Sequence, residues 1–111
     1  MPQTFFRIVK HAMPSRSDFL SNAALGRTPA RPLSPTQAAM WEGLSVFDCA
    51  VHARRQARDR SWLGSFIAEI SIGDQIEATW KRTNPVNPGH YTLWADPDDL
   101  LLCIVRIDPV N

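Results

Sequence analysis

The alternation of apolar and polar residues is clearest between residues 43 and 72, where it predicts a strand, a helix and a second strand. Residues 44–47 (LSVF) form a short run of the kind found in strands. Residues 66–72 alternate with a period of two, and Phe66, Ala68, Ile70 and Ile72 fall on one face. If the two strands are parallel neighbours, the connection between them should be right-handed.

The helix between these strands is expected over residues 49–60. Ala50, Ala53 and Ala57 recur on one side of it, and a stripe of small residues lets a helix lie close to a sheet. Asp48 stands immediately before the helix, where a carboxylate can accept hydrogen bonds from the free N–H groups of the first turn. The sequence therefore predicts Asp48 as the N-cap.

The rest of the chain is divided into shorter elements. Further strands are predicted at residues 4–9, 75–82, 90–94 and 100–107, the last as an apolar central strand buried on both faces. Short helices are predicted at residues 18–25, after Ser15 or Ser17, and at residues 38–42, after the capping box of Ser34 and Gln37. The segments 27–35 and 83–89, rich in proline, are predicted loops.

A last helical turn is expected after Asp96, with Pro97 at its first position. The elements together predict an α+β fold with small mixed, largely antiparallel sheets and short helices. The 111 residues, 44% of them hydrophobic, are enough for one domain spanning residues 1–111.

Charge and cysteine content narrow the classes of partner. The net charge of +1 gives no strong nucleic-acid signal and no reason to expect a membrane surface. Cys49 and Cys103 lack metal-ligand spacing and are predicted to be buried free thiols, and the aspartates from Asp96 to Asp99 are explained by helix capping, so no metal is expected. No stretch reads as a signal peptide or a membrane span, which predicts a cytoplasmic protein.

Arg7 in FFRIV, Ser45 in GLSVF and the alanine-rich helix that follows resemble the ADP-ribosyltransferase-like fold. Members of this family bind NAD in a cleft between two small sheets. The resemblance implies that Arg7 holds the dinucleotide and that Ser45 lines the nicotinamide pocket. The segments GLSVFD and GHYTLWADP also resemble those of a group of small uncharacterised bacterial proteins.

Transferases of this family carry a glutamate on a late strand, and here the corresponding segment, GHYTLWADP, has His90 or Tyr91 instead. Glu69, on an earlier strand, is the alternative catalytic carboxylate. Family members without the glutamate, such as the RNA 2′-phosphotransferases, hold phosphates with arginine and histidine, and this resemblance implies such a use for Arg7, His11 and His90.

The cluster HYTLW joins a titratable group to aromatic rings. His90 is a candidate acid or base near pH 7, and Tyr91 and Trp94 are candidates for stacking on a nicotinamide or adenine ring. The same alternation also fits an ordinary strand. The candidate catalytic residues are therefore His90 and Glu69, and the candidate cofactor-binding residues are Arg7, Ser45, Tyr91 and Trp94, with NAD as the cofactor.

Two functions are consistent with these residues. The first is an enzyme that cleaves NAD or transfers an ADP-ribosyl or phosphoryl group from NAD or a related ribose phosphate. The second is a catalytically inactive module of the same fold that binds a small-molecule ligand or a protein partner. The missing late glutamate favours the second, and the pairing of Arg7 with Ser45 favours the first.

Overall fold

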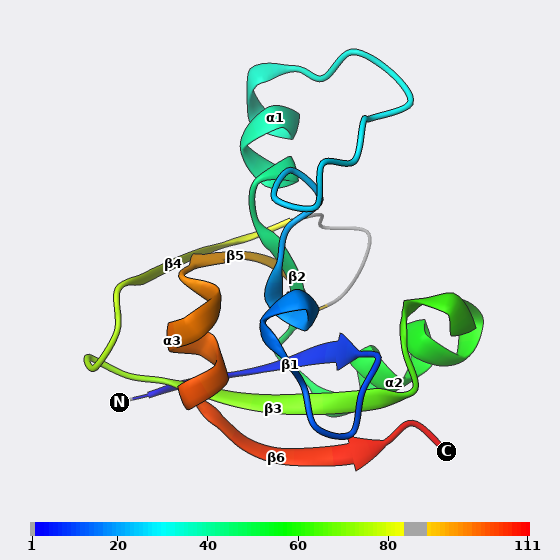
Figure 1. The fold of residues 1–111 in the computed structure, drawn as a ribbon, viewed down its shortest axis with the longest axis vertical. Helices are drawn as coiled ribbons and strands as arrows, with labels where there is room; N and C mark the ends of the chain where they lie inside the picture. The colour runs from blue at the N-terminus through cyan, green and yellow to red at the C-terminus, as the bar shows by residue number, and fades with distance from the viewer. Residues whose placement is uncertain (1, 84–88) are drawn as a thin grey trace.

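The protein is built on one six-stranded sheet, seen in a computed structural model that describes residues 2–83 and 89–111 (Figure 1). The strand order is β4-β5-β2-β1-β3-β6, and all pairings among the described strands are antiparallel. The predicted α+β class is confirmed, whereas the expected mixed pairing is wrong. The strands are β1 (Gln3–Val9), β2 (Leu44–Phe47), β3 (Phe66–Ile72), β4 (Ala78–Arg82), β5 (His90–Ala95) and β6 (Ile104–Pro109).

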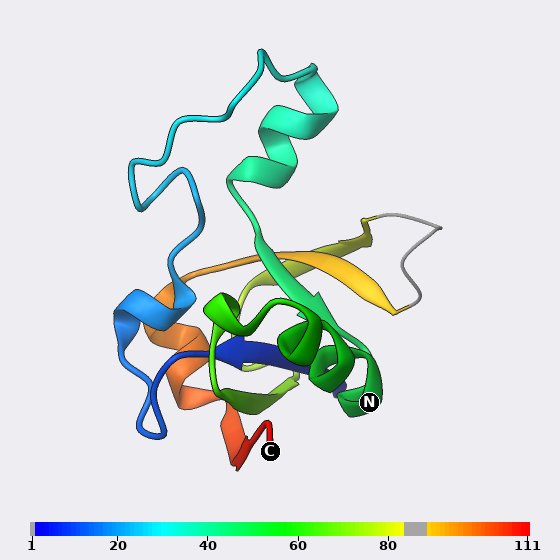
Figure 2. The same ribbon diagram turned by 90° about the vertical axis from the view of Figure 1, so that its right-hand side faces the viewer.

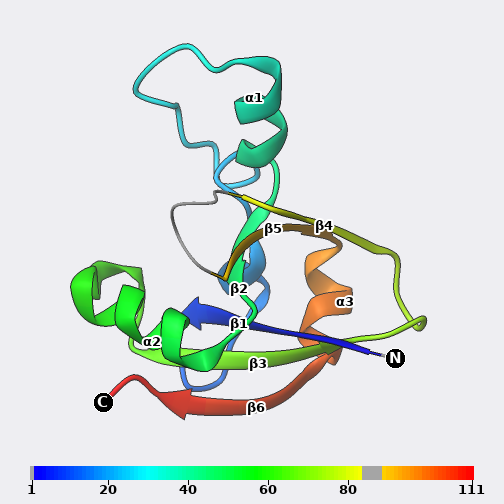
Figure 3. The same ribbon diagram turned by 180° about the vertical axis from the view of Figure 1, so that it is seen from behind.

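Helices cover both faces of the sheet, and one projects away from it. The α-helices are α1 (Pro35–Trp41), α2 (Ala50–Asp59) and α3 (Pro97–Leu102), and the 3₁₀ turns are η1 (Arg16–Phe19) and η2 (Ser61–Leu63). Helix α2 lies on one face, and η1 and α3 lie on the other (Figures 1 and 3). Helix α1 stands at the end of an arm that extends beyond the sheet (Figure 2).

The two faces carry separate apolar clusters. The larger one joins β1, β2, β3 and β5 to Phe19 of η1 and Leu100 of α3. The smaller one joins Ala53 and Ala57 of α2 to the sheet, mainly at Phe47 and Ile67. Both alanines are at most 2% exposed, which confirms the predicted stripe at these two positions, while Ala50 is half-buried. The helix therefore packs close to the sheet, with little room for a larger side chain.

The strand–helix–strand unit predicted between residues 43 and 72 is confirmed, but its two strands are not neighbours, because β1 lies between them. The predicted N-cap is also wrong. Helix α2 begins at Ala50 with Cys49 at the N-cap position. Asp48 instead continues the contact between β2 and β5, since its N–H donates to the carbonyl of Gly89 at 2.9 Å.

The prediction of a helix at residues 18–25 is wrong. The chain forms the short turn η1 at Arg16–Phe19 and then turns again over residues 22–26, ending at Gly26, whose φ of 74° favours glycine. The side chain of Asp18 accepts hydrogen bonds from the backbone of Lys10 and Ser15, which fixes a tight turn instead of a helix. Strand β4 likewise begins at Ala78, three residues later than predicted, because a turn occupies residues 74–76.

The prediction of a central strand over residues 100–107 is wrong. Its first part belongs to α3, and β6 begins only at Ile104 and forms an edge of the sheet. The predicted cap is present, since Asp96 Oδ1 accepts from the N–H of Asp98 at 2.8 Å, with Pro97 at the first helical position. Because the first turn is capped, the helix continues over the run of leucines, and Leu100 and Cys103 are buried in the core.

The capping box that starts α1 is confirmed. Ser34 Oγ accepts from the N–H of Gln37 at 3.2 Å, and Gln37 Oε1 accepts from the N–H of Ser34 at 3.0 Å. Of the loop predicted at residues 83–89, residues 84–88 lie outside the described residues.

Both cysteines are free thiols, as predicted, and Cys103 is buried. The predicted burial of Cys49 is wrong, because it is only half-buried at the start of α2. Burial raises the pKa of the Cys103 thiol. Within residues 2–83 and 89–111, no three of the usual metal-binding side chains gather at one place. In the same part of the chain, none of the helices has the length and apolar character needed to cross a membrane.

Candidate functional site

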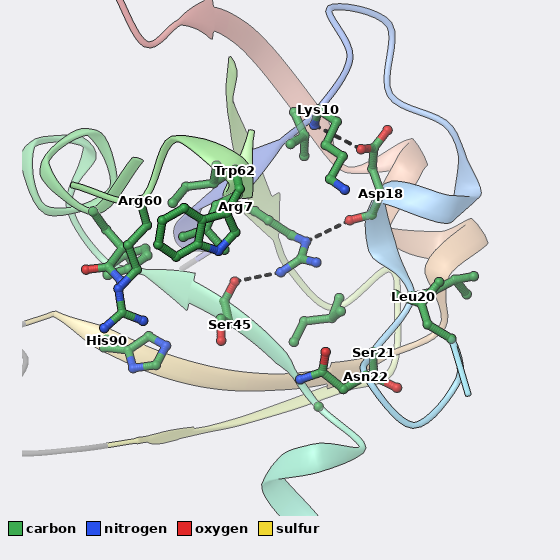
Figure 4. Close-up of a pocket in the computed structure, with 18 of the residues that line it drawn as sticks. Arg7, Lys10, Asp18, Leu20, Ser21, Asn22, Ser45, Arg60, Trp62 and His90 are labelled. Atoms are coloured by element: carbon green, nitrogen blue, oxygen red, sulfur yellow. Dashed lines mark hydrogen bonds between the residues drawn. The ribbon is translucent and has the colours of Figure 1, made fainter. Parts of the chain in front are cut away.

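A cleft opens where β1 and β2 move apart. In the described part of the chain the two strands are in register only at Phe6 and Phe47, whereas β1 pairs with β3 along its whole length. Beyond Phe6 the strand pair is open, and the side chain of Arg7 crosses from β1 to the backbone of β2 (Figure 4). The cleft therefore begins at the point where the sheet loses its continuous hydrogen bonding.

The cleft has a volume of about 870 Å³, which is within the range of small-molecule sites. Its walls come from segments far apart in the sequence. They are the end of β1, the segment after η1, strand β2, one side of α2, the turn η2 and the start of β5. The fold therefore assembles a concave site that no short stretch of the chain could form.

Arg7 lies at the centre of this cleft. Its Nε donates to the carbonyl of Asp18 at 2.8 Å, and its Nη1 donates to the carbonyl of Ser45 at 2.8 Å. Both acceptors are neutral, and the ion pairs formed by the described residues do not include Arg7. The guanidinium is thus fixed in place while its charge and its other N–H groups stay available to a ligand.

Burial lowers the pKa of Arg7 to about 10, and the nearby charge of Asp18 acts in the opposite direction. At neutral pH the side chain is therefore a cation. Its Cζ also lies 6.0 Å from the centroid of the Phe19 ring, so an apolar ring covers one side of it. A charge in such surroundings attracts an anion more strongly than an arginine in open water does.

Asp18 holds η1 against the end of β1. Its side chain is 3% exposed and accepts from the N–H groups of Lys10 at 3.0 Å and Ser15 at 3.1 Å, and it pairs with His11 Nδ1 at 3.1 Å. Burial alone would raise the pKa of this carboxyl, but the bonds from His11 and the two N–H groups outweigh burial and lower it. Asp18 thereby positions its own carbonyl for Arg7.

The charges around the cleft are mainly positive. Five basic side chains line it against two acidic ones, and one of the two acids is the engaged carboxylate of Asp18. Three histidines add groups that donate hydrogen bonds when protonated. The basic residues are Arg7, Lys10, Arg27, Arg55 and Arg60, the acidic ones Asp18 and Asp59, and the histidines His11, His52 and His90. This balance favours an anionic ligand.

His90 contributes a neutral imidazole. Burial lowers its pKa, and its ring lies 5.2 Å from the ring of Phe47 with an interplanar angle of 31°. The Nδ1 atoms of His90 and His52 are buried without a hydrogen-bond partner among the residues that the structure describes. Buried polar atoms of this kind are uncommon in proteins and are often found at binding sites.

The structure brings Arg7, Ser45, His90 and His11 to the cleft. Ser45 contributes its carbonyl to Arg7, a contact that the sequence does not predict, and its exposed position on β2 faces the opening. Arg7 and Ser45 thus lie in contact in one cleft. Their roles toward a ligand stay a prediction.

Tyr91, Trp94 and Glu69 do not line the cleft. Tyr91 follows His90 in the strand and points to the opposite face, where its ring lies 5.5 Å from that of Phe5. Trp94 lies at the other end of β5 and donates from Nε1 to the carbonyl of Ala39 at 2.9 Å, which holds α1. Glu69 lies in β3, in register with Arg106 of the edge strand β6.

Many residues of the cleft were not singled out from the sequence as parts of a site, among them Asp18, Arg60 and Trp62. Asp18 had a local signal, because Ser15 and Asp18 have the spacing of a capping box. Arg60 and Trp62 had none, since they reach the cleft only through the path of the chain after α2.

Comparisons with known proteins add no assignment. Models of protein families, curated proteins and solved structures all give no match to this chain. The geometry and charge of the cleft are therefore the features that bear on function.

Proposed function

We propose that the cleft binds a nucleotide anion, NAD or a related ribose phosphate, and that Arg7 anchors its phosphate. The observation that carries this proposal is the state of Arg7, which two neutral carbonyls hold in a predominantly basic cleft. Arginine binds phosphate through paired N–H donors, and the N–H groups of Arg7 that do not bond Asp18 and Ser45 suit this contact.

We also propose that the fold is a degenerate ADP-ribosyltransferase-like one. The separation of β1 from β2 divides the sheet into two halves, β4-β5-β2 and β1-β3-β6. A cleft between two such halves is where the resemblance implies that NAD binds. This feature supports the proposal.

The chemistry of the site favours binding over cleavage of NAD. Release of nicotinamide develops positive charge on the ribose, which a fixed carboxylate stabilises. Of the two cleft carboxylates, Asp18 already accepts from three groups, and Asp59 is exposed at the end of α2. These two carboxylates are therefore also consistent with the alternative function, a catalytically inactive module that binds a ligand or a protein partner.

If the protein is an enzyme, a neutral His90 suits proton transfer to or from a phosphorylated substrate.

The test is a thermal melt with millimolar NAD, ADP-ribose and a 2′-phosphorylated nucleotide. A ligand that binds only the folded protein stabilises it by RT ln(1 + [L]/Kd), or about 2.7 kcal/mol at 100 times Kd. We expect at least one of these compounds to raise the melting temperature. In Arg7→Ala and Arg55→Ala, which remove cations from the cleft, this rise should be lost or reduced.

Arg106→Ala is the matched control, because Arg106 is exposed on β6 and pairs with Asp108 away from the cleft. Its melting temperature should rise with ligand as in the wild type. Arg55→Ala is needed because Arg7→Ala also breaks two internal hydrogen bonds and can lower stability by itself. No rise with any of the three compounds would contradict nucleotide binding and favour the protein-partner alternative.

A further inference from the structure

Trp62 is a large apolar side chain that the fold leaves uncovered at the edge of the cleft. It belongs to η2 and is 71% exposed, yet it is one of the residues that line the cleft. In the view of Figure 4 its ring is drawn on the same side as Arg60 and above Ser45. Single exposed apolar residues are common on protein surfaces, but this one borders a concave basic site.

The backbone fixes the place of Trp62. The N–H of Leu63 donates to the carbonyl of Arg60 at 3.0 Å, which closes the turn around Trp62. The next residue, Gly64, has a φ of 155° and lies so close to the backbone of Val9 that a Cβ atom would collide with the Val9 carbonyl. The turn is thus held against the end of β1, two residues beyond Arg7, while Trp62 stays largely exposed.

We propose that Trp62 is a stacking site for the base of a nucleoside phosphate. This inference depends on the proposed anchoring of phosphate by Arg7 and adds the class of group that occupies the other part of the cleft. An exposed indole face stacks on any aromatic base. Arg60 lines the same cleft and supplies a cation that can contact a second phosphate or the base itself.

If Trp62 stacks on a base, the cleft should bind a nucleoside phosphate more tightly than a ligand that carries phosphate alone. Ribose 5-phosphate and pyrophosphate can bind Arg7 but have no base to stack on Trp62. ADP carries both groups. Since replacing one stacking aromatic by alanine weakens binding roughly 5- to 150-fold, the effect is large enough to measure.

The experiment compares the dissociation constants of ADP, ribose 5-phosphate and pyrophosphate by calorimetry. In the wild type, ADP should bind at least about fivefold more tightly than the other two. In Trp62→Ala this advantage should disappear, while the affinities for ribose 5-phosphate and pyrophosphate stay unchanged. Trp62→Phe, which keeps an aromatic face, should retain most of it.

Trp80→Phe is the control for loss of an indole, because Trp80 lies on β4 and packs on Phe5 outside the cleft. It should leave all three affinities unchanged. Equal affinity for ADP and ribose 5-phosphate in the wild type would overturn the stacking site but leave the phosphate anchor intact. Absence of binding by all three compounds would overturn both proposals.

Discussion

At the scale of single residues, the cleft depends on a short series of contacts that runs from the Asp18 carboxylate to the Ser45 carbonyl. The carboxylate fixes η1, the Asp18 carbonyl accepts from Arg7, and Arg7 reaches across to β2. Each contact leaves the next group with a defined position. The charge available to a ligand is therefore maintained by residues that need not touch the ligand.

Asp18→Asn tests this arrangement. The amide keeps the shape of the side chain but turns one acceptor into a donor, which then faces either the N–H of Lys10, bonded to Oδ1, or that of Ser15, bonded to Oδ2. A buried donor without an acceptor costs about 1–3 kcal/mol, so urea unfolding should show a loss of stability of this size. A variant as stable as the wild type would contradict the role assigned to Asp18.

The same variant should change the dependence of stability on pH. The pKa of Asp18 is lowered in the folded protein, so its contribution is complete above the ordinary value of 3.8 and is lost as the pH falls through 3.8 toward the folded pKa. The wild type should therefore lose this part of its stability in acid. Asp18→Asn should lack it, and parallel acid profiles for the two proteins would show that the carboxylate is not the cause.

At the scale of elements, α2 connects the core to the cleft. Its inner side places Ala53 and Ala57 on the sheet, and its other positions bring His52 and Arg55 to the opening. The close approach of the helix requires small residues at the inner positions. The site geometry therefore depends on the packing of alanines.

Ala53→Leu should disturb this packing. Ala53 is fully buried, and extra methylene groups in a packed core typically cost about 1–3 kcal/mol. A thermal melt or urea titration measures the effect. Val51→Leu, on the exposed side of the same helix, is the control and should change stability by less than about 0.5 kcal/mol. Equal stabilities for Ala53→Leu and the control would contradict the packing.

The sequence predicted the elements whose signals are local. The alternation in β3, the alanine stripe of α2 and the capping box of α1 each specify their element within a few residues. The run LLLCIVRI could not be assigned in this way, because a short apolar run fits either a buried strand or a buried helix. Asp96 and Pro97 fix the start of a helix, so the first part of this run is helical.

The candidate site was predictable only in part. Arg7, Ser45 and His90 could be selected by residue type and resemblance, and they do line one cleft. Glu69, Tyr91 and Trp94 were selected by the same means but lie elsewhere, because their faces depend on pairings between distant strands. The place of Trp62 in the cleft and the separation of β1 from β2 result from tertiary packing and have no local signal in the sequence.

At the scale of the whole molecule, charge is distributed unevenly although the chain is almost neutral. The net charge is +1, yet the cleft collects five basic side chains and two acidic ones. Total charge therefore gives little information about the ligand, whereas the place of the charges favours an anion. The folded arrangement, and not the composition, creates the electrostatic site.

Cleavage of NAD should be slow in this molecule. Among the residues that the structure describes, the cleft carboxylates are Asp18, which is engaged, and Asp59, which is exposed, so a bound ribose would lack a fixed carboxylate. The loss of one such contact typically reduces the rate about 10²- to 10³-fold. We expect nicotinamide release near the uncatalysed rate, measured by chromatography, and no change in Glu69→Gln, since Glu69 lies outside the cleft. Rapid release by the wild type that disappears in Glu69→Gln would show that the catalytic site has been misplaced.

Mapping of ADP-ribose binding by amide NMR shifts tests the central claim, that the cleft around Arg7 binds a nucleotide anion. On titration, we expect the largest shifts at the walls of the cleft, in residues 7–11, 17–22, 44–47 and 60–63 and at His90. Helix α3 and strand β6 should be unaffected. Shifts confined to α3 and β6, or no shifts at millimolar ADP-ribose, would contradict the account.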